Sequence, residues 1–339
     1  MEQTKTIKQL CAFRKGILAA DESIGTIGKR FSSISVENNL DNRINYRNLL
    51  FTASDIDKYI SGIITFEETL FNQDLIKPLL DKGIIVGIKT DKGLISISET
   101  EEENITRGLD TLLDRSKEYY KAGARFAKWR CVIDIDIDKN YPSEKAIDIN
   151  TNILAQYAKI SLQAGLIPIV EPEVLMTNCP NIETSEQVTR KTLTALYDKM
   201  NKMGIDLTKT LLKPNMVRQT LLNGKTNYTD KELVDISRRT FNVLKETVPI
   251  NVPGIMFLSG GMSENDSTVA LDKINKLVNN ASNHPSPLWR VSFSYGRALQ
   301  QSALKAWLGQ TDNLEKAQQK FIEKAQQNSL ASMGLYQVI

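Results

Sequence analysis

The sequence is poor in the side chains that most often bind metals or activate a nucleophile. Its 339 residues include one histidine, His284, and three cysteines, Cys11, Cys131 and Cys179. A zinc site with several histidines cannot be built from this set, and a Ser-His-Asp triad would depend on His284 alone. That histidine stands between asparagine and proline, so a solvated turn residue is its ordinary interpretation. We therefore expect no metal cofactor.

Disulfides, net charge and long apolar runs are scarce as well. The cysteines are odd in number and widely spaced, which excludes a disulfide framework and indicates a reducing compartment. A net charge of only +3 gives no basic field for nucleic acid. No apolar run approaches the ~18 residues of a membrane span, and residues 1–14 lack the apolar core of a signal peptide. We expect a cytoplasmic protein with neither nucleic acid nor membrane as partner.

Short apolar runs recur along the whole chain. With 41% hydrophobic and 24% charged residues, the composition is that of a soluble globular protein with a sizeable core. Eight of these runs are predicted strands: residues 16–21, 59–66, 84–90, 126–134, 167–173, 210–216, 254–260 and 290–295.

Helical patterns separate the later strands. They cover residues 103–122, 143–164, 184–203, 230–247 and 311–334, and Ser263 with Asp266 marks the start of another helix. The alternation predicts an α/β fold, a single (β/α)8 TIM barrel with extra N- and C-terminal helical segments. Residues 1–339 then form one domain, with its barrel at about 15–310 and a C-terminal helix at 311–334. A doubly wound sheet is the alternative, but it leaves strands over, and no Gly-x-Gly-x-x-Gly follows the first strand. The acidic residues 98–103 are expected to form a solvated loop.

Two of the predicted strands end in charge. Residues 165–173 are apolar until Glu171 and Glu173, and residues 210–216 are apolar except for Lys213 and an asparagine. An isolated buried charge is costly, so such groups are paired, neutralised or functional. Burial also favours the neutral amine of a lysine, which is its nucleophilic form. The pattern indicates Schiff-base chemistry.

The other strands also end in polar or charged residues. Barrel active sites lie at the C-terminal ends of strands, so these residues are expected to converge on one mouth. They are Asp21, Lys89, Lys128, Arg130, Glu171, Glu173, Lys213, Ser259 and Ser294. Each has a structural alternative: Asp21 as a turn or cap carboxylate, Lys128 with Arg130 as a salt-bridge network, and Lys213 as a surface lysine.

Two glycine-containing loops predict a phosphate site. Ser259-Gly260-Gly261 ends the seventh strand, and Ser294-Tyr-Gly296-Arg297 ends the eighth. Loops at these places commonly bind phosphate through backbone N–H groups at a helix start, and an arginine adds a charge-assisted contact. Paired glycines alone are most often turns, but here two such loops lie at matching strand ends.

Six motifs between residues 15 and 300 resemble those of class I fructose-1,6-bisphosphate aldolases, the metal-independent Schiff-base type, and the resemblance runs from about residue 16 to residue 334. The motifs are Lys15-Gly-Ile-Leu-Ala-Ala-Asp-Glu-Ser23, Phe126-Ala-Lys-Trp-Arg-Cys131, Ile169-Val-Glu-Pro-Glu173, Leu211-Leu-Lys-Pro-Asn-Met216, Phe257-Leu-Ser-Gly-Gly261 and Phe293-Ser-Tyr-Gly-Arg-Ala-Leu-Gln300. Their length and their order along the chain make the resemblance specific.

The resemblance implies a role for each catalytic position. Lys213 falls on the Schiff-base lysine and Glu171 on the general acid/base, with Glu173 as its supporting carboxylate. Lys128 falls on the neighbouring cation, and Asp21 falls on the carboxylate beside the substrate hydroxyls.

The same resemblance implies the phosphate contacts. Those nearest the ketone end are Ser259, Gly260, Gly261, Gly296 and Arg297, while Ser23, Thr26, Lys29, Arg30 and Lys89 lie near the substrate phosphates and Arg130 faces the substrate. Thr26 stands where the family usually has serine, and it keeps the hydroxyl.

The resemblance also implies the reaction, which is reversible cleavage of fructose 1,6-bisphosphate to dihydroxyacetone phosphate and glyceraldehyde 3-phosphate in glycolysis and gluconeogenesis. It implies a homotetramer and no cofactor. Sedoheptulose 1,7-bisphosphate is an alternative substrate, and a non-catalytic scaffold for acidic or cytoskeletal partners is an alternative function. Known members carry a terminal tyrosine that assists proton transfer, whereas this sequence ends Tyr336-Gln-Val-Ile339, so we expect another group or a slower exchange here.

Overall fold

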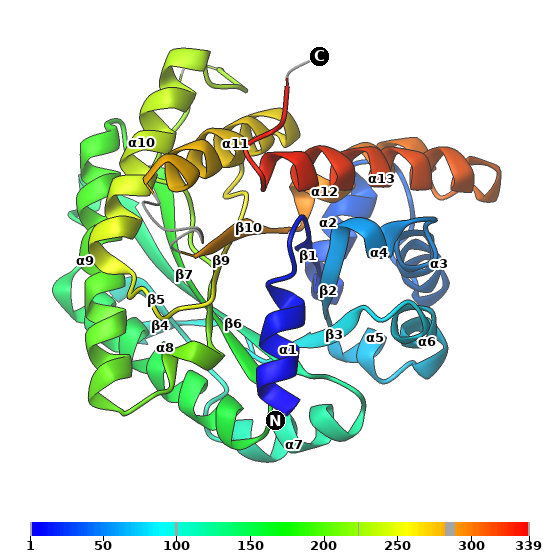
Figure 1. The fold of residues 1–339 in the computed structure, drawn as a ribbon, viewed down its shortest axis with the longest axis horizontal. Coiled ribbons are helices and arrows are strands. Elements are labelled where there is room, and N and C mark those ends of the chain that lie inside the picture. The colour runs from blue at the N-terminus through cyan, green and yellow to red at the C-terminus, as the bar shows by residue number, and fades with distance from the viewer. Residues whose placement is uncertain (1, 99–100, 223, 282–288, 338–339) are drawn as a thin grey trace.

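The computed structural model describes residues 2–98, 101–222, 224–281 and 289–337, and its centre is a closed barrel of parallel strands (Figure 1). The barrel strands are β1 Gly16–Ala20, β2 Ile60–Thr65, β3 Ile85–Lys89, β6 Phe126–Asp136, β7 Ile167–Asn178, β8 Leu211–Leu212, β9 Gly254–Phe257 and β10 Arg290–Tyr295. Each strand pairs with its neighbours along the chain, and β10 closes the barrel against β1. The predicted (β/α)8 barrel is confirmed.

Helices form the outer layer of the barrel, and a short helix covers one end. They are α1 Glu2–Leu10, α2 Ile24–Ser32, α3 Leu40–Phe51, α4 Ile56–Tyr59, α5 Glu67–Leu70, α6 Gln73–Asp81, α7 Leu112–Lys121, α8 Glu144–Gln163, α9 Ile182–Lys202, α10 Asp230–Thr247, α11 Glu264–Ala281, α12 Arg297–Trp307 and α13 Leu314–Ala331, with 3₁₀ turns Ile137–Lys139, Leu207–Lys209 and Thr311–Asn313. Among the described residues, no helix is long and apolar enough to cross a membrane.

Local sequence explains where several of these helices begin. The Thr229 side chain accepts from the Glu232 backbone at the start of α10, and the Glu232 carboxylate binds the Thr229 N–H in return. The Ser263 hydroxyl accepts from the backbone N–H of Asp266 at 3.1 Å, as its spacing predicts. Such caps satisfy N–H groups that have no partner within the helix.

The barrel interior is divided into an apolar base and a charged top. Ile7 and Leu10 of α1 pack against Phe126 and other strand residues to fill the base. Gly87 is required there, because a Cβ at this position would collide with the Phe126 ring. The buried charges of the barrel lie at the opposite end, where the strands finish. Along β6 the first buried cation is Lys128.

The structure differs from the sequence-based prediction around residues 98–122. The predicted helix 103–122 is wrong in its first part, because β5 Glu101–Thr106 pairs antiparallel with β4 Leu94–Ser98. Gly108, with a φ of 114°, then turns the chain before α7. The predicted solvated loop at 98–103 is wrong for Glu103, which is buried and accepts from the Ser143 N–H at 2.8 Å. Residues 99–100 lie outside the described part of the chain, as does His284.

Several strands also differ in length from the prediction. β6 and β7 stay paired beyond the barrel rim, whereas β8 has only two residues because Pro214 has no N–H to donate. The segment nevertheless continues along the barrel, since the Lys213 N–H donates to the Val170 carbonyl and the Leu258 N–H donates to the Pro214 carbonyl.

The C-terminal segment packs outside the barrel. α13 lies against α12 and α11 and reaches over α3 (Figure 1). Beyond it, the Tyr336 N–H donates to the Asp272 carboxylate at 2.9 Å, and the Tyr336 ring is partly buried against the core. Tyr336 is therefore held against α11.

Candidate active site

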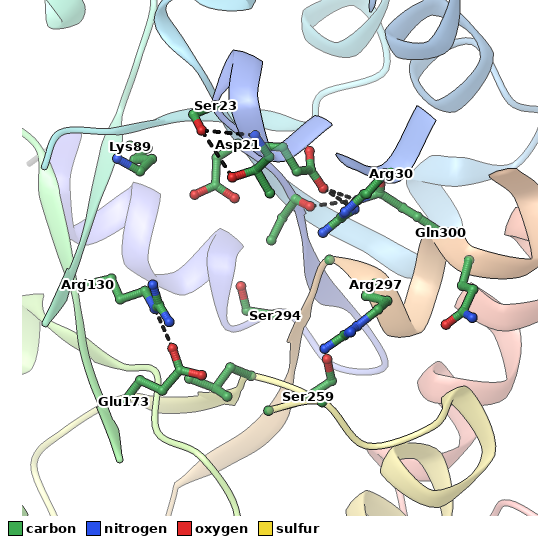
Figure 2. A pocket seen from close by; sticks show the side chains of 18 of the residues that line it. Asp21, Ser23, Arg30, Lys89, Arg130, Glu173, Ser259, Ser294, Arg297 and Gln300 are labelled. Atoms are coloured by element: carbon green, nitrogen blue, oxygen red, sulfur yellow. Dashed lines mark hydrogen bonds and ion pairs between the residues drawn. The ribbon is translucent and has the colours of Figure 1, made fainter. Parts of the chain in front are cut away.

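One cavity of about 610 Å³ lies at the C-terminal ends of the barrel strands. All the residues predicted from the sequence as catalytic or phosphate-binding line it: Asp21, Ser23, Thr26, Lys29, Arg30, Lys89, Lys128, Arg130, Glu171, Glu173, Lys213, Ser259, Gly260, Gly261, Ser294, Gly296 and Arg297. Figure 2 shows Ser259 and Arg297 on one side of this cavity and Lys89 and Arg130 on the other. The barrel brings these residues together from segments almost 280 positions apart.

Four charged side chains of alternating sign form a row at the floor of the cavity. The Lys128 Nζ atom lies 2.6 Å from the Asp21 carboxylate and 3.2 Å from Glu171 Oε2. The other Glu171 oxygen, Oε1, lies 3.2 Å from the Lys213 Nζ atom. The side chains of Lys128, Glu171 and Lys213 are each at most 5% exposed. We call Asp21, Lys128, Glu171 and Lys213 the charge row.

The charge row holds Asp21 and Lys128 in the ionised form. Burial alone would raise the pKa of Asp21, but the ammonium groups of Lys128 and Lys213 outweigh burial and lower it well below its usual value. Burial alone would lower the pKa of Lys128, but the carboxylates of Asp21 and Glu171 raise it well above its usual value. Asp21 therefore stays anionic and Lys128 stays cationic throughout the neutral range.

The pairing of β6 with β7 explains which groups meet. Arg130 lies opposite Glu171 in the register of the two strands. Its guanidinium nevertheless pairs with Glu173, two residues further along β7 (Figure 2). Lys128 likewise reaches Glu171 rather than Ile169, its own register partner. Glu171 is thus left between two lysines, while Glu173 is engaged by an arginine. Of the two carboxylates, only Glu171 contacts Lys213 among the described residues.

Lys213 is held in place through its backbone and its neighbours in the chain. Its N–H donates to the Val170 carbonyl at 2.8 Å. Two residues on, the Asn215 side chain accepts from the Val174 N–H at 2.8 Å. These bonds join the lysine segment to β7, the strand that carries Glu171, so the 3.2 Å contact between Lys213 and Glu171 has support on both sides.

The Ser259 side of the cavity offers backbone and hydroxyl groups. Gly260 and Gly261 have φ values of 54° and 83°, which glycine adopts at low cost. The Ser294 Oγ atom is buried and has no hydrogen-bond partner among the described residues. Gly296 caps α12, so the first N–H groups of that helix lie beside Arg297. This combination is suited to an anion.

Arg297 is surrounded by positive charge. Burial and then the guanidinium of Arg30 lower the pKa of Arg297 from its ordinary value. Crowded guanidinium groups repel one another, so an anion placed between them relieves the repulsion.

The α2 side of the cavity contains a carboxylate that the sequence analysis did not assign. Glu22 is buried and pairs with Arg30 and, at 2.7 Å, with Arg47. Gln300 donates to Glu22 at 3.2 Å and to the Ala19 carbonyl at 2.7 Å. These contacts fix the Arg30 guanidinium at the cavity. Glu22 and Gln300 both stand inside motifs that the sequence analysis quotes, so the signal was present.

The remaining lining residues were not predicted, although Ala19 and Leu258 also lie inside motifs quoted above. They are Ala19, Ser33, Leu258, Gln301, Leu304 and Lys305. Gln301, Leu304 and Lys305 come from α12 and Ser33 directly follows α2, and the rule that active-site residues lie at strand ends does not cover these positions.

Lys89 is engaged by a neighbour on its own segment. Its Nζ atom lies 2.5 Å from Asp91 Oδ1 and 2.8 Å from the Asp91 carbonyl. The pair lies beside Arg130, where a second pocket adjoins the main cavity. Lys89 is therefore within the cavity and paired with Asp91.

The chemistry of the cavity does not suit a metal ion. Within the described part of the chain, no three histidine, cysteine, aspartate or glutamate side chains gather in a way that could hold one. The carboxylates of the cavity are each paired with lysine or arginine, which compete with a cation for the same oxygens. The arrangement instead supports covalent chemistry on a buried lysine.

Comparisons with known proteins agree with this geometry. The family model for class-I fructose-bisphosphate aldolase matches residues 2–339. A curated relative, fructose-bisphosphate aldolase 2 of Plasmodium berghei, is 47% identical over 340 residues, which cover 99% of this chain and 89% of that protein. Fructose-bisphosphate aldolase C of Pan troglodytes is 47% identical, covering 95% of this chain and 87% of that protein.

A solved structure gives the same result. It is fructose-bisphosphate aldolase from Plasmodium falciparum in complex with TRAP and a small-molecule inhibitor, with a TM-score of 0.93 and 44% identity, covering 100% of this chain and 96% of that one. Fold, cavity and sequence relationships lead to one conclusion: the chain belongs to the class-I fructose-bisphosphate aldolase family.

Proposed function

We propose that Lys213 is the Schiff-base nucleophile of this enzyme and that Glu171 carries its protons. The chain is a lyase of the fructose-bisphosphate aldolase type. The observation that carries the residue assignment is the 3.2 Å contact between the Lys213 Nζ atom and Glu171 Oε1, both buried at the floor of a cavity lined with cations.

The reaction begins when Lys213 passes a proton to Glu171, 3.2 Å away, and the neutral amine attacks the C2 ketone. Glu171 protonates the carbinolamine hydroxyl, which leaves as water and gives an iminium ion. The C4 hydroxyl then passes its proton to Glu171 as the C3–C4 bond breaks. The electron pair of that bond moves toward the iminium nitrogen and forms an enamine, and the aldehyde half departs. Protonation of the enamine and hydrolysis release dihydroxyacetone phosphate and restore Lys213.

Within this mechanism, Lys128 and Asp21 keep the site ordered. Lys128 holds the Glu171 and Asp21 carboxylates in a fixed orientation, because it contacts both. Asp21 remains anionic and can accept hydrogen bonds from substrate hydroxyls. Glu173 holds Arg130 toward the cavity.

The phosphate groups are assigned to the two cationic sides of the cavity. The ketone-side phosphate binds at Ser259, Gly260, Gly261, Ser294, Gly296 and Arg297. The distal half of the substrate is placed toward Ser23, Thr26, Lys29, Lys89 and Arg130, and Arg30 lies close to both sides. Lys89 must exchange its Asp91 contact for the substrate if it binds phosphate directly.

The proposal extends to the state of the whole protein. It includes the absence of a cofactor, a homotetrameric assembly and one domain spanning residues 1–339, and the support for all three is the family model that matches residues 2–339. Cytoplasmic localisation is supported by relatives described as cytosolic, such as fructose-bisphosphate aldolase 4 of Arabidopsis thaliana at 47% identity.

The residue assignment is tested by trapping the imine. Borohydride added with dihydroxyacetone phosphate should reduce the Schiff base and place the substrate mass on the peptide that contains Lys213. Lys213→Met should abolish trapping and cleavage, because the amine is lost. The matched control is Lys209→Met, which removes an ammonium paired with Asp206 on the preceding 3₁₀ turn and should leave trapping unchanged.

Trapping on another lysine, or unchanged trapping in Lys213→Met, would refute the mechanism. Steady-state assays with fructose 1,6-bisphosphate and sedoheptulose 1,7-bisphosphate, run on the same preparation, measure which ketose bisphosphate the enzyme prefers.

A further inference from the structure

Arg218 lies behind the Ser259-Gly260-Gly261 loop and holds it from outside the cavity. Its Nη2 atom donates to the Gly260 carbonyl oxygen. Arg218 is not among the residues that line the cavity, whereas Gly260 and Gly261 are. The contact therefore comes from a residue that does not itself line the ligand space.

The peptide unit between Gly260 and Gly261 links that contact to the ligand. In a trans peptide the C=O and N–H bonds point in opposite directions. With the Gly260 carbonyl turned toward Arg218, the Gly261 N–H is turned the other way, toward the cavity that Gly261 lines. Neither the Gly260 N–H nor the Gly261 N–H has an acceptor among the described residues. Both glycines have positive φ, so without an external contact this peptide is free to turn over.

Arg218 is itself anchored. Its Nη1 atom lies 3.2 Å from the Tyr228 hydroxyl, which donates to the Gln219 carbonyl at 2.6 Å. The Tyr228 N–H donates to the Asp266 carboxylate at 3.0 Å, and Asp266 lies in the first turn of α11, just after the loop. Tyr228 thus connects the arginine to the helix that follows the loop.

The position of Arg218 in the sequence gives the contact a further consequence. It lies five residues after Lys213 on the same segment, and its backbone N–H donates to the Ser185 hydroxyl at 3.2 Å. The segment that carries the proposed nucleophile therefore also fixes the loop that faces the phosphate. A Cβ placed on Gly261 would lie 3.8 Å from Arg218 Nη2 and 3.5 Å from Arg297 Nη2, so two guanidinium groups flank this glycine.

We propose that Arg218 is a positioning residue for the ketone-side phosphate: it orients the Gly260–Gly261 peptide so that the Gly261 N–H donates to that phosphate. The inference rests on the proposed Schiff-base function and deepens it by assigning a residue behind the site. Arg297 binds the same phosphate from within the cavity, and Arg218 determines where the backbone donor points.

The test compares two ketones that differ only in the phosphate. Dihydroxyacetone phosphate and dihydroxyacetone are each titrated against the full-length chain, and borohydride trapping at Lys213 is measured by mass spectrometry. In Arg218→Met the half-saturating concentration of dihydroxyacetone phosphate should rise about tenfold, the factor that corresponds to about 1.4 kcal/mol. The value for dihydroxyacetone should not change, because it has no phosphate to position.

Two further variants complete the design. Arg190→Met removes a guanidinium that pairs with Glu186 and Glu246 outside the site, and it should change neither titration. Tyr228→Phe keeps the charge of Arg218 and its 3.3 Å bond to the Gln219 carbonyl but removes the Tyr228 anchor. It should therefore weaken binding of dihydroxyacetone phosphate alone, by a smaller factor than Arg218→Met. Tyr228→Phe also serves if Arg218→Met does not fold.

The outcomes separate the two proposals. If the unmodified chain traps neither ketone at Lys213, the proposed function fails. If it traps both and Arg218→Met leaves dihydroxyacetone phosphate unchanged, or shifts both ketones equally, only the inference on Arg218 fails. A third outcome is that Arg218→Met raises the half-saturating concentration of dihydroxyacetone phosphate alone, while Tyr228→Phe changes neither titration. That outcome assigns the effect to the charge of Arg218 and also overturns the positioning role.

Discussion

Replacing Lys128 with methionine tests the charge row most directly. Methionine keeps most of the volume of lysine and removes the ammonium that contacts Asp21 at 2.6 Å and Glu171 at 3.2 Å. The row then holds two carboxylates and only one cation, Lys213. Removing one partner of a buried ion pair lowers stability by about 3–5 kcal/mol, because the charge left behind remains buried.

A second substitution should restore part of the stability that Lys128→Met loses. Asp21→Asn together with Lys128→Met restores one carboxylate opposite one ammonium, Glu171 opposite Lys213. The double variant should therefore be more stable than the sum of the single effects predicts, with an interaction energy of about 0.5–3 kcal/mol, the range for residues in direct contact. The measurement is the free energy of unfolding in guanidinium chloride, with all variants compared at one protein concentration.

The pH dependence has a definite sign. In the wild type the pKa of Asp21 is lowered on folding, so Asp21 contributes stability above its unfolded pKa, and that contribution is lost as pH falls. In Lys128→Met the nearest cation is gone, burial dominates, and protonation of the surplus carboxylate relieves the unpaired charge. The difference in unfolding free energy between wild type and Lys128→Met should therefore narrow from about pH 8 to about pH 5. Two results would refute the coupling within the charge row. One is that the stability changes of Asp21→Asn and Lys128→Met are strictly additive in the double variant. The other is that the difference in unfolding free energy between wild type and Lys128→Met widens toward acid pH.

Three further outcomes follow from the cavity and its surroundings. Arg297→Ala should lower kcat/KM for fructose 1,6-bisphosphate about 10- to 150-fold, since a charge-assisted hydrogen bond contributes roughly 1.5–3 kcal/mol. Fructose 6-phosphate should be affected much less, and equal losses would mean that Arg297 serves the other phosphate. Exhaustive chelation should leave activity intact, and a loss that zinc restores would overturn the assignment to metal-independent chemistry. Tyr336→Phe should leave kcat unchanged, because Tyr336 packs on α11 and is not among the cavity residues; a slower exchange of the enamine proton in this variant would contradict that placement.

The strand ends explain why so much of the site could be read from the sequence. Lys213 and Glu171 each follow an apolar run and are buried. Because burial of an unpaired charge is costly, such residues are expected to be paired or to take part in function. The barrel rule then brings these ends to one mouth without any knowledge of side-chain contacts. The helices before β3 carry weaker patterns, and α3, although it packs in the core, was not predicted.

The contacts between side chains could not be predicted in the same way. The sequence shows Lys128, Arg130, Glu171 and Glu173 as two pairs of like charge, and only the register of β6 against β7 decides which carboxylate meets which cation. The contact of Arg218 is even harder to predict from the sequence. Arg218 follows the strand end and lies outside the cavity, so neither an apolar run nor a glycine loop points to it. Its contact with Gly260 arises from the path of the chain between β8 and α10.

The distribution of charge explains how one cavity can hold both a neutral floor and a strongly anionic substrate. Eight cationic side chains and four carboxylates line the cavity, which leaves an excess of four positive charges, while the whole chain carries only +3. The positive excess at this site is therefore larger than the net charge of the whole protein, and the rest of the chain is slightly acidic. The charge row is balanced, so the excess lies around it, where the phosphates are expected. Each phosphate monoester carries about −1.5 to −2 near pH 7. A bisphosphate matches this excess and a monophosphate matches only half of it, so the field of the cavity favours the doubly phosphorylated sugar before any single contact forms.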